Sequence, residues 1–211
     1  MLADDTSALC AALRQCAGRE VVLVLDNCGL ELIADLLLVD GLLRLVAPSS
    51  IVLHVKDTPV FVSDVCLHDF PLTLDWLDSN GGGAMAARLR AALDSGSLTL
   101  VAHPFYTSAH PFWDMPDDLF AIFGSAGAVL LKGDANYRRL LGDRHWPHDT
   151  PFSPLMRRYW PAATPVAALR TCKSGVLVGV APEVEAAAMA AEPGRWLTAG
   201  VYGLISLAPG V

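Results

Sequence analysis

Charged residues are scarce in this chain. Asp, Glu, Lys and Arg make up only 18% of its 211 residues, whereas hydrophobic residues make up 53%. A composition this apolar excludes an intrinsically disordered protein. Basic residues are also in the minority, and the net charge of −7 argues against general binding to nucleic acid. A chain of this length is expected to form a single domain, residues 1–211, with a core of its own.

Several sequence signals are missing. The five cysteines include no Cys-x-x-Cys pair, so we expect reduced, mostly structural thiols. The longest apolar segment, 30–47, contains charged residues at four positions and therefore indicates an amphipathic helix, because a membrane span needs roughly 20 nearly uncharged residues. The first residues lack the basic start of a secretion signal. We therefore expect a cytoplasmic protein with no membrane partner.

Apolar runs alternate with helical patterns along the chain. Strands are predicted at 20–25, 50–55, 97–102, 127–131, 166–171, 175–180 and 200–207. Helices are predicted near 4–17, 29–46, 70–78, 84–94, 117–123 and 183–191, with a further one beginning after Lys132. This alternation predicts an α/β protein, a Rossmann-like three-layer α/β/α sandwich around a central, mostly parallel sheet.

Two of the apolar runs end in oxygen-bearing side chains. Asp26 and Asn27 follow the run at 20–25, and Asp64 follows the apolar residues at 61–62. Taken alone, each is more often a turn or helix cap than a metal site. Strand ends nevertheless converge on one edge of a parallel sheet, where open α/β sheets bind ligands. Carboxylates and a carboxamide gathered there suit a hard divalent cation.

Two further strand ends carry groups that suit an anion. The segment 132–139 places a glycine and then Asp, Asn, Tyr and Arg at a predicted helix start, whose amides can bind an anion. Lys173 closes the segment 170–173 and can act as a point charge on a phosphate. On the helix after Asn27, Glu31 is close enough to reach the site, whereas Asp35 is expected to be structural. Together these groups indicate metal-assisted phosphoryl transfer.

Four motifs carry a resemblance to a known family. They are Asp26-Asn27-x-Gly29-x-Glu31-Leu32, Phe61-Val62-Ser63-Asp64-Val65, Lys132-Gly133-Asp134-x-Asn136-Tyr137-Arg138-Arg139 and Arg170-Thr171-x-Lys173. In this order they resemble the signatures of the metal-dependent damage-control phosphatases. The last motif points to subfamily III, which is related to the proteins once proposed as acidic-residue or protein-glutamate methyltransferases.

The resemblance implies specific roles. Asp26, Asn27 and Asp64 would bind one divalent metal ion, typically manganese, cobalt, nickel or magnesium. The substrate would be held by Asp26, Asn27, Glu31, Asp134, Ala135, Asn136, Tyr137, Arg138 and Lys173, the last on its phosphate. Asp26 and Lys173 would be catalytic, with either metal-bound water or the Asp26 carboxylate as nucleophile. The expected substrates are small phosphometabolites, including sugar phosphates such as fructose 1-phosphate and fructose 6-phosphate.

One departure from the family concerns the segment before the Asp-Asn strand. Members of the subfamily usually carry a long helical region there, whereas here residues 1–19 precede the strand. Together with the apolar composition, this predicts an exposed apolar patch that is covered by a homo-oligomer contact or by a separate helical partner.

Three alternatives remain at this point. A haloacid-dehalogenase-type phosphatase would need a second Asp where Cys28 stands. A carboxyl methyltransferase that uses S-adenosylmethionine is disfavoured, because no Gly-x-Gly-x-x-Gly loop follows the first strand. The third is a non-catalytic or partner-dependent metabolite-binding domain, which the intact polar sets argue against.

Overall fold

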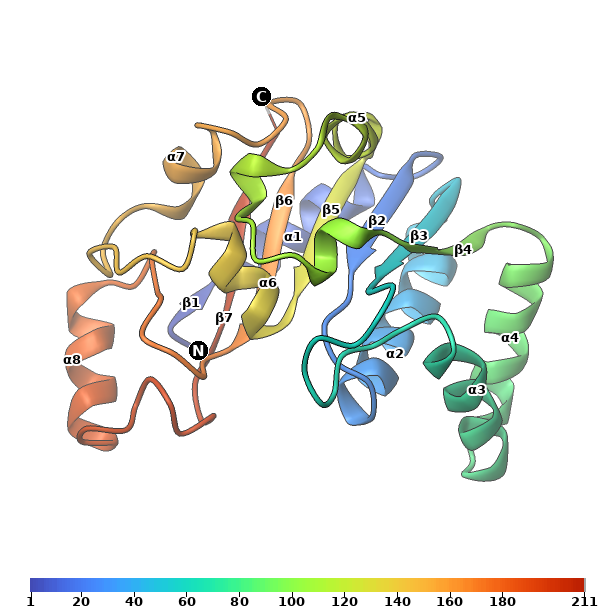
Figure 1. Ribbon diagram of the computed structural model, residues 1–211, viewed down its shortest axis with the longest axis horizontal. Helices are drawn as coiled ribbons and strands as arrows, with labels where there is room; N and C mark the ends of the chain where they lie inside the picture. The colour runs from blue at the N-terminus through green and yellow to red at the C-terminus, as the bar shows by residue number, and fades with distance from the viewer. Residues whose placement is uncertain (211) are drawn as a thin grey trace.

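The computed structural model describes residues 1–210, which form one seven-stranded sheet with helices on both faces (Figure 1). The strand order is β1-β7-β6-β5-β2-β3-β4. The strands are β1 (Ala3–Asp4), β2 (Glu20–Val24), β3 (Ser50–Val55), β4 (Leu98–Ala102), β5 (Ala128–Lys132), β6 (Val166–Thr171) and β7 (Gly203–Ala208). From β6 to β4 all neighbours are parallel, whereas β7 is antiparallel to β6 and parallel to β1. The predicted α/β sandwich with a mostly parallel sheet is confirmed.

Two apolar layers cover the sheet. In β2, Val22 and Val24 face one layer, whereas Val21 and Leu23 face the other, as the alternation of a strand requires. The layer that contains Leu23 is built by α1 (Thr6–Arg14), α2 (Leu30–Leu45), α3 (Asp69–Ser79) and α4 (Gly83–Asp94). The opposite layer is built by η1 (Pro104–Thr107), η2 (Phe112–Asp114), α5 (Asp117–Ser125), α6 (Gly133–Leu140), α7 (Phe152–Met156) and α8 (Pro182–Ala191). Within residues 1–210, no helix combines the length and apolar character that crossing a bilayer requires.

The strand predicted at 175–180 is wrong. Val176, Leu177 and Val178 are buried, which explains their apolar pattern, but their backbone is irregular. The amide of Val178 donates to the Tyr137 hydroxyl, 3.2 Å away, and the next two amides donate to carbonyls at 148 and 150. These hydrogen bonds go to separate segments instead of one neighbouring strand. The short strand β1 and the helix α7 lie where the sequence indicated no such elements.

The chain changes direction across the sheet next to β2. From β2 it passes through α2 to β3 on one side, and it later returns through α5 to β5 on the other side. Because α2 and α5 pack on opposite faces, a crevice is expected between the carboxyl ends of β2 and β5. The residues that follow these two strands are therefore placed where this type of fold binds ligands.

Gly142, which closes the C-terminal end of α6, is required by both conformation and space. Its φ is +68°, and a Cβ there would overlap the Trp113 ring. At Gly96 φ is +75°, but a Cβ would meet open space. We expect Gly142→Ala to lower the free energy of unfolding by about 1–3 kcal/mol more than Gly96→Ala does, since overpacking adds to left-handed strain. Equal losses in denaturant unfolding would contradict this packing.

Candidate active site

The backbone brings three predicted metal ligands together. Asn27 and Asp64 form an isolated antiparallel bridge between the loops that follow β2 and β3. The amide of Val65 also donates to the carbonyl of Asp26 at 3.0 Å. Asp26, Asn27 and Asp64 therefore lie side by side at the carboxyl edge of the sheet, as their positions after apolar runs predicted.

A lysine lies between the two carboxylates. Lys56 directly follows β3, and its side chain is only 5% exposed. Its Nζ is 3.4 Å from Asp26 Oδ1 and donates a hydrogen bond to Asp64 Oδ1. Lys56 was not among the predicted site residues, although it follows an apolar strand just as Asp26 does.

The two carboxyl groups differ in their electrostatic surroundings. Burial raises the pKa of Asp26, and the nearby Lys56 and the Ala135 amide offset this only in part. Burial acts in the same direction on Asp64, but hydrogen bonds from Lys56 and from the amides of Phe61 and Val60 outweigh it and lower its pKa. The negative charge of Asp64 is thus stabilised by its surroundings. The charge of Asp26 is only partly stabilised, because the single ammonium group of Lys56 is shared with Asp64.

Gly133 lets helix α6 approach Asp26. Its φ is +83°, and a Cβ at this position would overlap the Asp26 carboxylate. The first turn of α6 therefore begins directly over the end of β2, with the Ala135 amide as a hydrogen-bond donor to Asp26. The positive end of a helix at this point favours negative charge.

Glu31 and Ser63 fix the carboxamide of Asn27. Its Nδ2 donates to Glu31 Oε2 at 2.9 Å, and its Oδ1 accepts from the Ser63 hydroxyl at 2.7 Å. The second oxygen, Glu31 Oε1, is buried and has no hydrogen-bond partner. Glu31 reaches the strand end as the sequence predicted.

The donor set fits a hard cation. Asp26, Asn27 and Asp64 offer carboxylate and carboxamide oxygens, the ligands that magnesium and manganese prefer. The buried, unpartnered Glu31 Oε1 adds a further oxygen next to them. No group of three or more His, Cys, Asp or Glu gathers into a metal site in the part of the chain that the structure describes, so a metal ion here would depend on the carboxamide as well as the two carboxylates.

Asp134 and Lys173 lie at the neighbouring strand ends. Arg170 Nε donates to Asp134 Oδ1 at 2.7 Å, and the Lys173 amide approaches the same oxygen at 3.3 Å. This ion pair joins the start of α6 to the end of β6. Glu31, Asp134 and Lys173 all line one cavity of about 470 Å³.

The other predicted substrate residues are placed differently. Asn136 is buried, and its Nδ2 donates to the carbonyls of Leu25 and Lys132. Tyr137 is also buried, which raises its pKa to about 12, and it accepts the Val178 amide. Both side chains hold α6 against the sheet.

Ala135 and Arg138 line a second cavity, of about 270 Å³, together with Phe61. In the structure Arg138 pairs with Asp143 at 2.7 Å. Five of the predicted substrate residues thus line two cavities, Glu31, Asp134 and Lys173 the one of about 470 Å³ and Ala135 and Arg138 the one of about 270 Å³.

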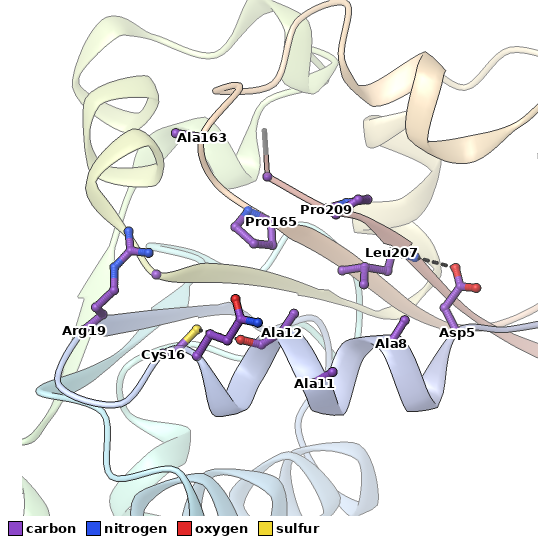
Figure 2. A pocket seen from close by; sticks show the side chains of 13 residues that line it. Asp5, Ala8, Ala11, Ala12, Cys16, Arg19, Ala163, Pro165, Leu207 and Pro209 are labelled. Carbon is purple, nitrogen blue, oxygen red and sulfur yellow. Dashed lines mark hydrogen bonds between the residues drawn. The ribbon is translucent and has the colours of Figure 1, made fainter.

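A further cavity lies elsewhere. It has a volume of about 570 Å³ and is bounded by α1, the residues around Pro165 and the end of β7 (Figure 2). Arg19 and Gly127 in its wall precede β2 and β5, so this cavity is at the amino edge of the sheet. None of the predicted site residues lines it.

Comparisons with known proteins identify the family to which this chain is similar. The model of the damage-control phosphatase ARMT1-like domain matches residues 1–188. Damage-control phosphatase ARMT1 of mouse is 37% identical to this chain over 97% of the chain and 49% of the mouse protein, and its human counterpart is 33% identical over 97% and 48%. The chain thus spans about half the length of the curated relatives it matches.

A solved structure supports the fold. The crystal structure of a DUF89-family protein from Pyrococcus horikoshii matches 84% of this chain and 50% of that chain, with a TM-score of 0.50 and 15% identity. At that identity the likeness concerns the fold alone. The sequence match covers most of the chain, and on that ground the chain belongs to the family of ARMT1-like damage-control phosphatase domains.

Proposed function

We propose that this domain is the catalytic part of a metal-dependent phosphatase that acts on small phosphometabolites, with sugar phosphates such as fructose 1-phosphate and fructose 6-phosphate as the expected class. The observation that carries the proposal is the buried pair Asp26 and Asp64, which shares a single ammonium group at the sheet's ligand-binding edge. The similarity to damage-control phosphatases of mouse and human supports a phosphatase.

In this proposal each side chain has a distinct task. Asp26, Asn27 and Asp64 hold a manganese, cobalt, nickel or magnesium ion, which would supply charge neutralisation at the phosphoryl oxygens. Lys173 binds the phosphate from the neighbouring strand end. Glu31 keeps the Asn27 carboxamide oriented. Arg170 holds Asp134 at the wall of the cavity of about 470 Å³. In-line attack on phosphorus, by water or by the Asp26 carboxylate, breaks the P–O bond to the sugar, which leaves as the alcohol; if Asp26 attacks, water then hydrolyses the aspartyl phosphate to free phosphate.

We further propose that the protein acts in the cytoplasm. All five cysteines are unpaired, which supports a reducing compartment such as the cytoplasm.

Three apolar side chains on the loop that leads to Asp64 are exposed; they are Val60, Phe61 and Val62, and Phe61 is 67% exposed. We propose that a second copy or a helical partner covers these apolar side chains.

Asp26→Asn tests the phosphatase directly. Phosphate release from sugar phosphates and a generic aryl phosphate, measured on metal-stripped protein resupplied with each metal ion, is expected to be metal-dependent. The variant keeps the size of the side chain but loses its charge, so turnover should fall at least about 100-fold. Asp57→Asn, an equal charge change on an exposed neighbour, should leave turnover near the parent value. Metal-independent turnover, or an active Asp26→Asn, would refute the proposal, whereas no turnover with any metal ion would favour a non-catalytic domain.

Lys56→Met tests the shared positive charge. Without the ammonium, the two buried carboxylates lose the cation that they share, and the metal-free variant should be destabilised by about 3–5 kcal/mol. A divalent cation restores the charge, so manganese should raise the melting temperature more in the variant than in the parent.

Lys173→Met provides the matched control for this experiment. It makes the same change in charge at an exposed position outside the carboxylate pair, so its metal-free melting temperature should remain close to that of the parent. An equal metal-induced shift in the parent and in Lys56→Met would contradict a cation site at Asp26 and Asp64.

A further inference from the structure

Asp35 lies one helical turn beyond Glu31 on α2 and faces the same cavity of about 470 Å³. Its side chain is 2% exposed, and its Oδ1 is 3.0 Å from Lys132 Nζ. Its other oxygen, Oδ2, is buried and has no hydrogen-bond partner, as is Glu31 Oε1. Two residues on one helix face thus line a cavity next to the candidate active site, and each has a buried acceptor oxygen without a donor.

A purely structural role explains only one of the two carboxylate oxygens of Asp35. The ion pair with Lys132 ties α2 to the end of β5 across the crevice. Burial nevertheless raises the pKa of the Asp35 carboxyl to about 6, so the partner does not fully compensate the charge. Buried acceptors are ordinarily paired, and those left open at a cavity wall are groups that a ligand can satisfy.

The lining of the cavity indicates the chemistry of that ligand. Three carboxylates, from Glu31, Asp35 and Asp134, are matched by three cations, from Lys132, Arg170 and Lys173. With Lys173 on the phosphate, the remaining side chains carry more carboxylates than cations, so this part of the cavity suits hydrogen-bond donors such as hydroxyl groups better than a further anion. Leu169, Leu204 and Ile205 add apolar surface to the same wall, which suits the C–H faces of a sugar or another polyol.

We propose that Asp35, positioned by Lys132, forms a subsite that accepts hydrogen bonds from the hydroxyl groups of the phosphate ester's polyol part. The inference rests on the proposed phosphatase function and adds to it a residue that selects hydroxylated esters. The cavity volume is within the range of about 300–1,000 Å³ that small-molecule sites occupy.

The test is the selectivity of Asp35→Asn between two esters. The ratio of kcat/KM for a sugar phosphate to kcat/KM for an aryl phosphate without hydroxyl groups should fall about 10-fold or more in the variant, mainly through KM. Asp40→Asn is the matched control, because Asp40 is also buried on α2 but pairs with Arg88 away from the cavity. It should leave the ratio unchanged.

Two outcomes would overturn the subsite. One is an unchanged ratio in Asp35→Asn, and the other is an equal fall in Asp40→Asn, which would mark a general effect of disturbing α2. Should the parent protein hydrolyse no ester with any metal ion, the proposed function fails and binding decides the subsite separately. A sugar phosphate should then raise the melting temperature of the parent and of Asp40→Asn but not of Asp35→Asn, and equal shifts in all three would refute the subsite.

Discussion

The candidate site depends on positive charge supplied to two buried carboxylates. Asp26 and Asp64 come from different loops, and the bridge between those loops forces the two groups together. Removing two anions from water is costly unless opposite charge and hydrogen bonds compensate them. Lys56 and the amides of the Val60–Phe61 turn supply this for Asp64, whereas Asp26 relies on the same ammonium and on the start of α6. Any change at this point therefore affects three strand ends together.

Much of the architecture could be predicted from the sequence because its parallel strands are buried on both faces. Such strands appear as continuous apolar runs, and each of the runs that end at Val24, Val55 and Lys132 is followed by a polar residue that reaches the site. The same signal failed at 175–180, where apolar residues pack under Tyr137 without pairing to a neighbouring strand. Burial alone produces that pattern, so a run of apolar residues cannot separate a strand from a buried irregular segment.

The directions in which the site side chains point could not be predicted from the sequence. The motif at 132–139 suggested a set of substrate contacts, yet Asn136 and Tyr137 point into the protein and hydrogen-bond to backbone groups. Successive residues of a helix lie about 100° apart, so one short motif necessarily sends side chains to several environments. Lys56 was missed for a related reason, since a lysine after a strand is usually solvated, and only the bridge between the two loops encloses it.

The position of Gly133 divides the site into two chemically different ends. On one side lie Asp26 and Asp64, with an excess of negative charge that a cation would relieve. On the other side the charges around Asp35 and Lys132 balance, and two acceptor oxygens remain open. A phosphate ester has the same division, with a dianionic group that needs cations and an alcohol part that needs hydrogen-bond partners. The glycine lets the two ends lie next to each other, because any side chain there would overlap Asp26.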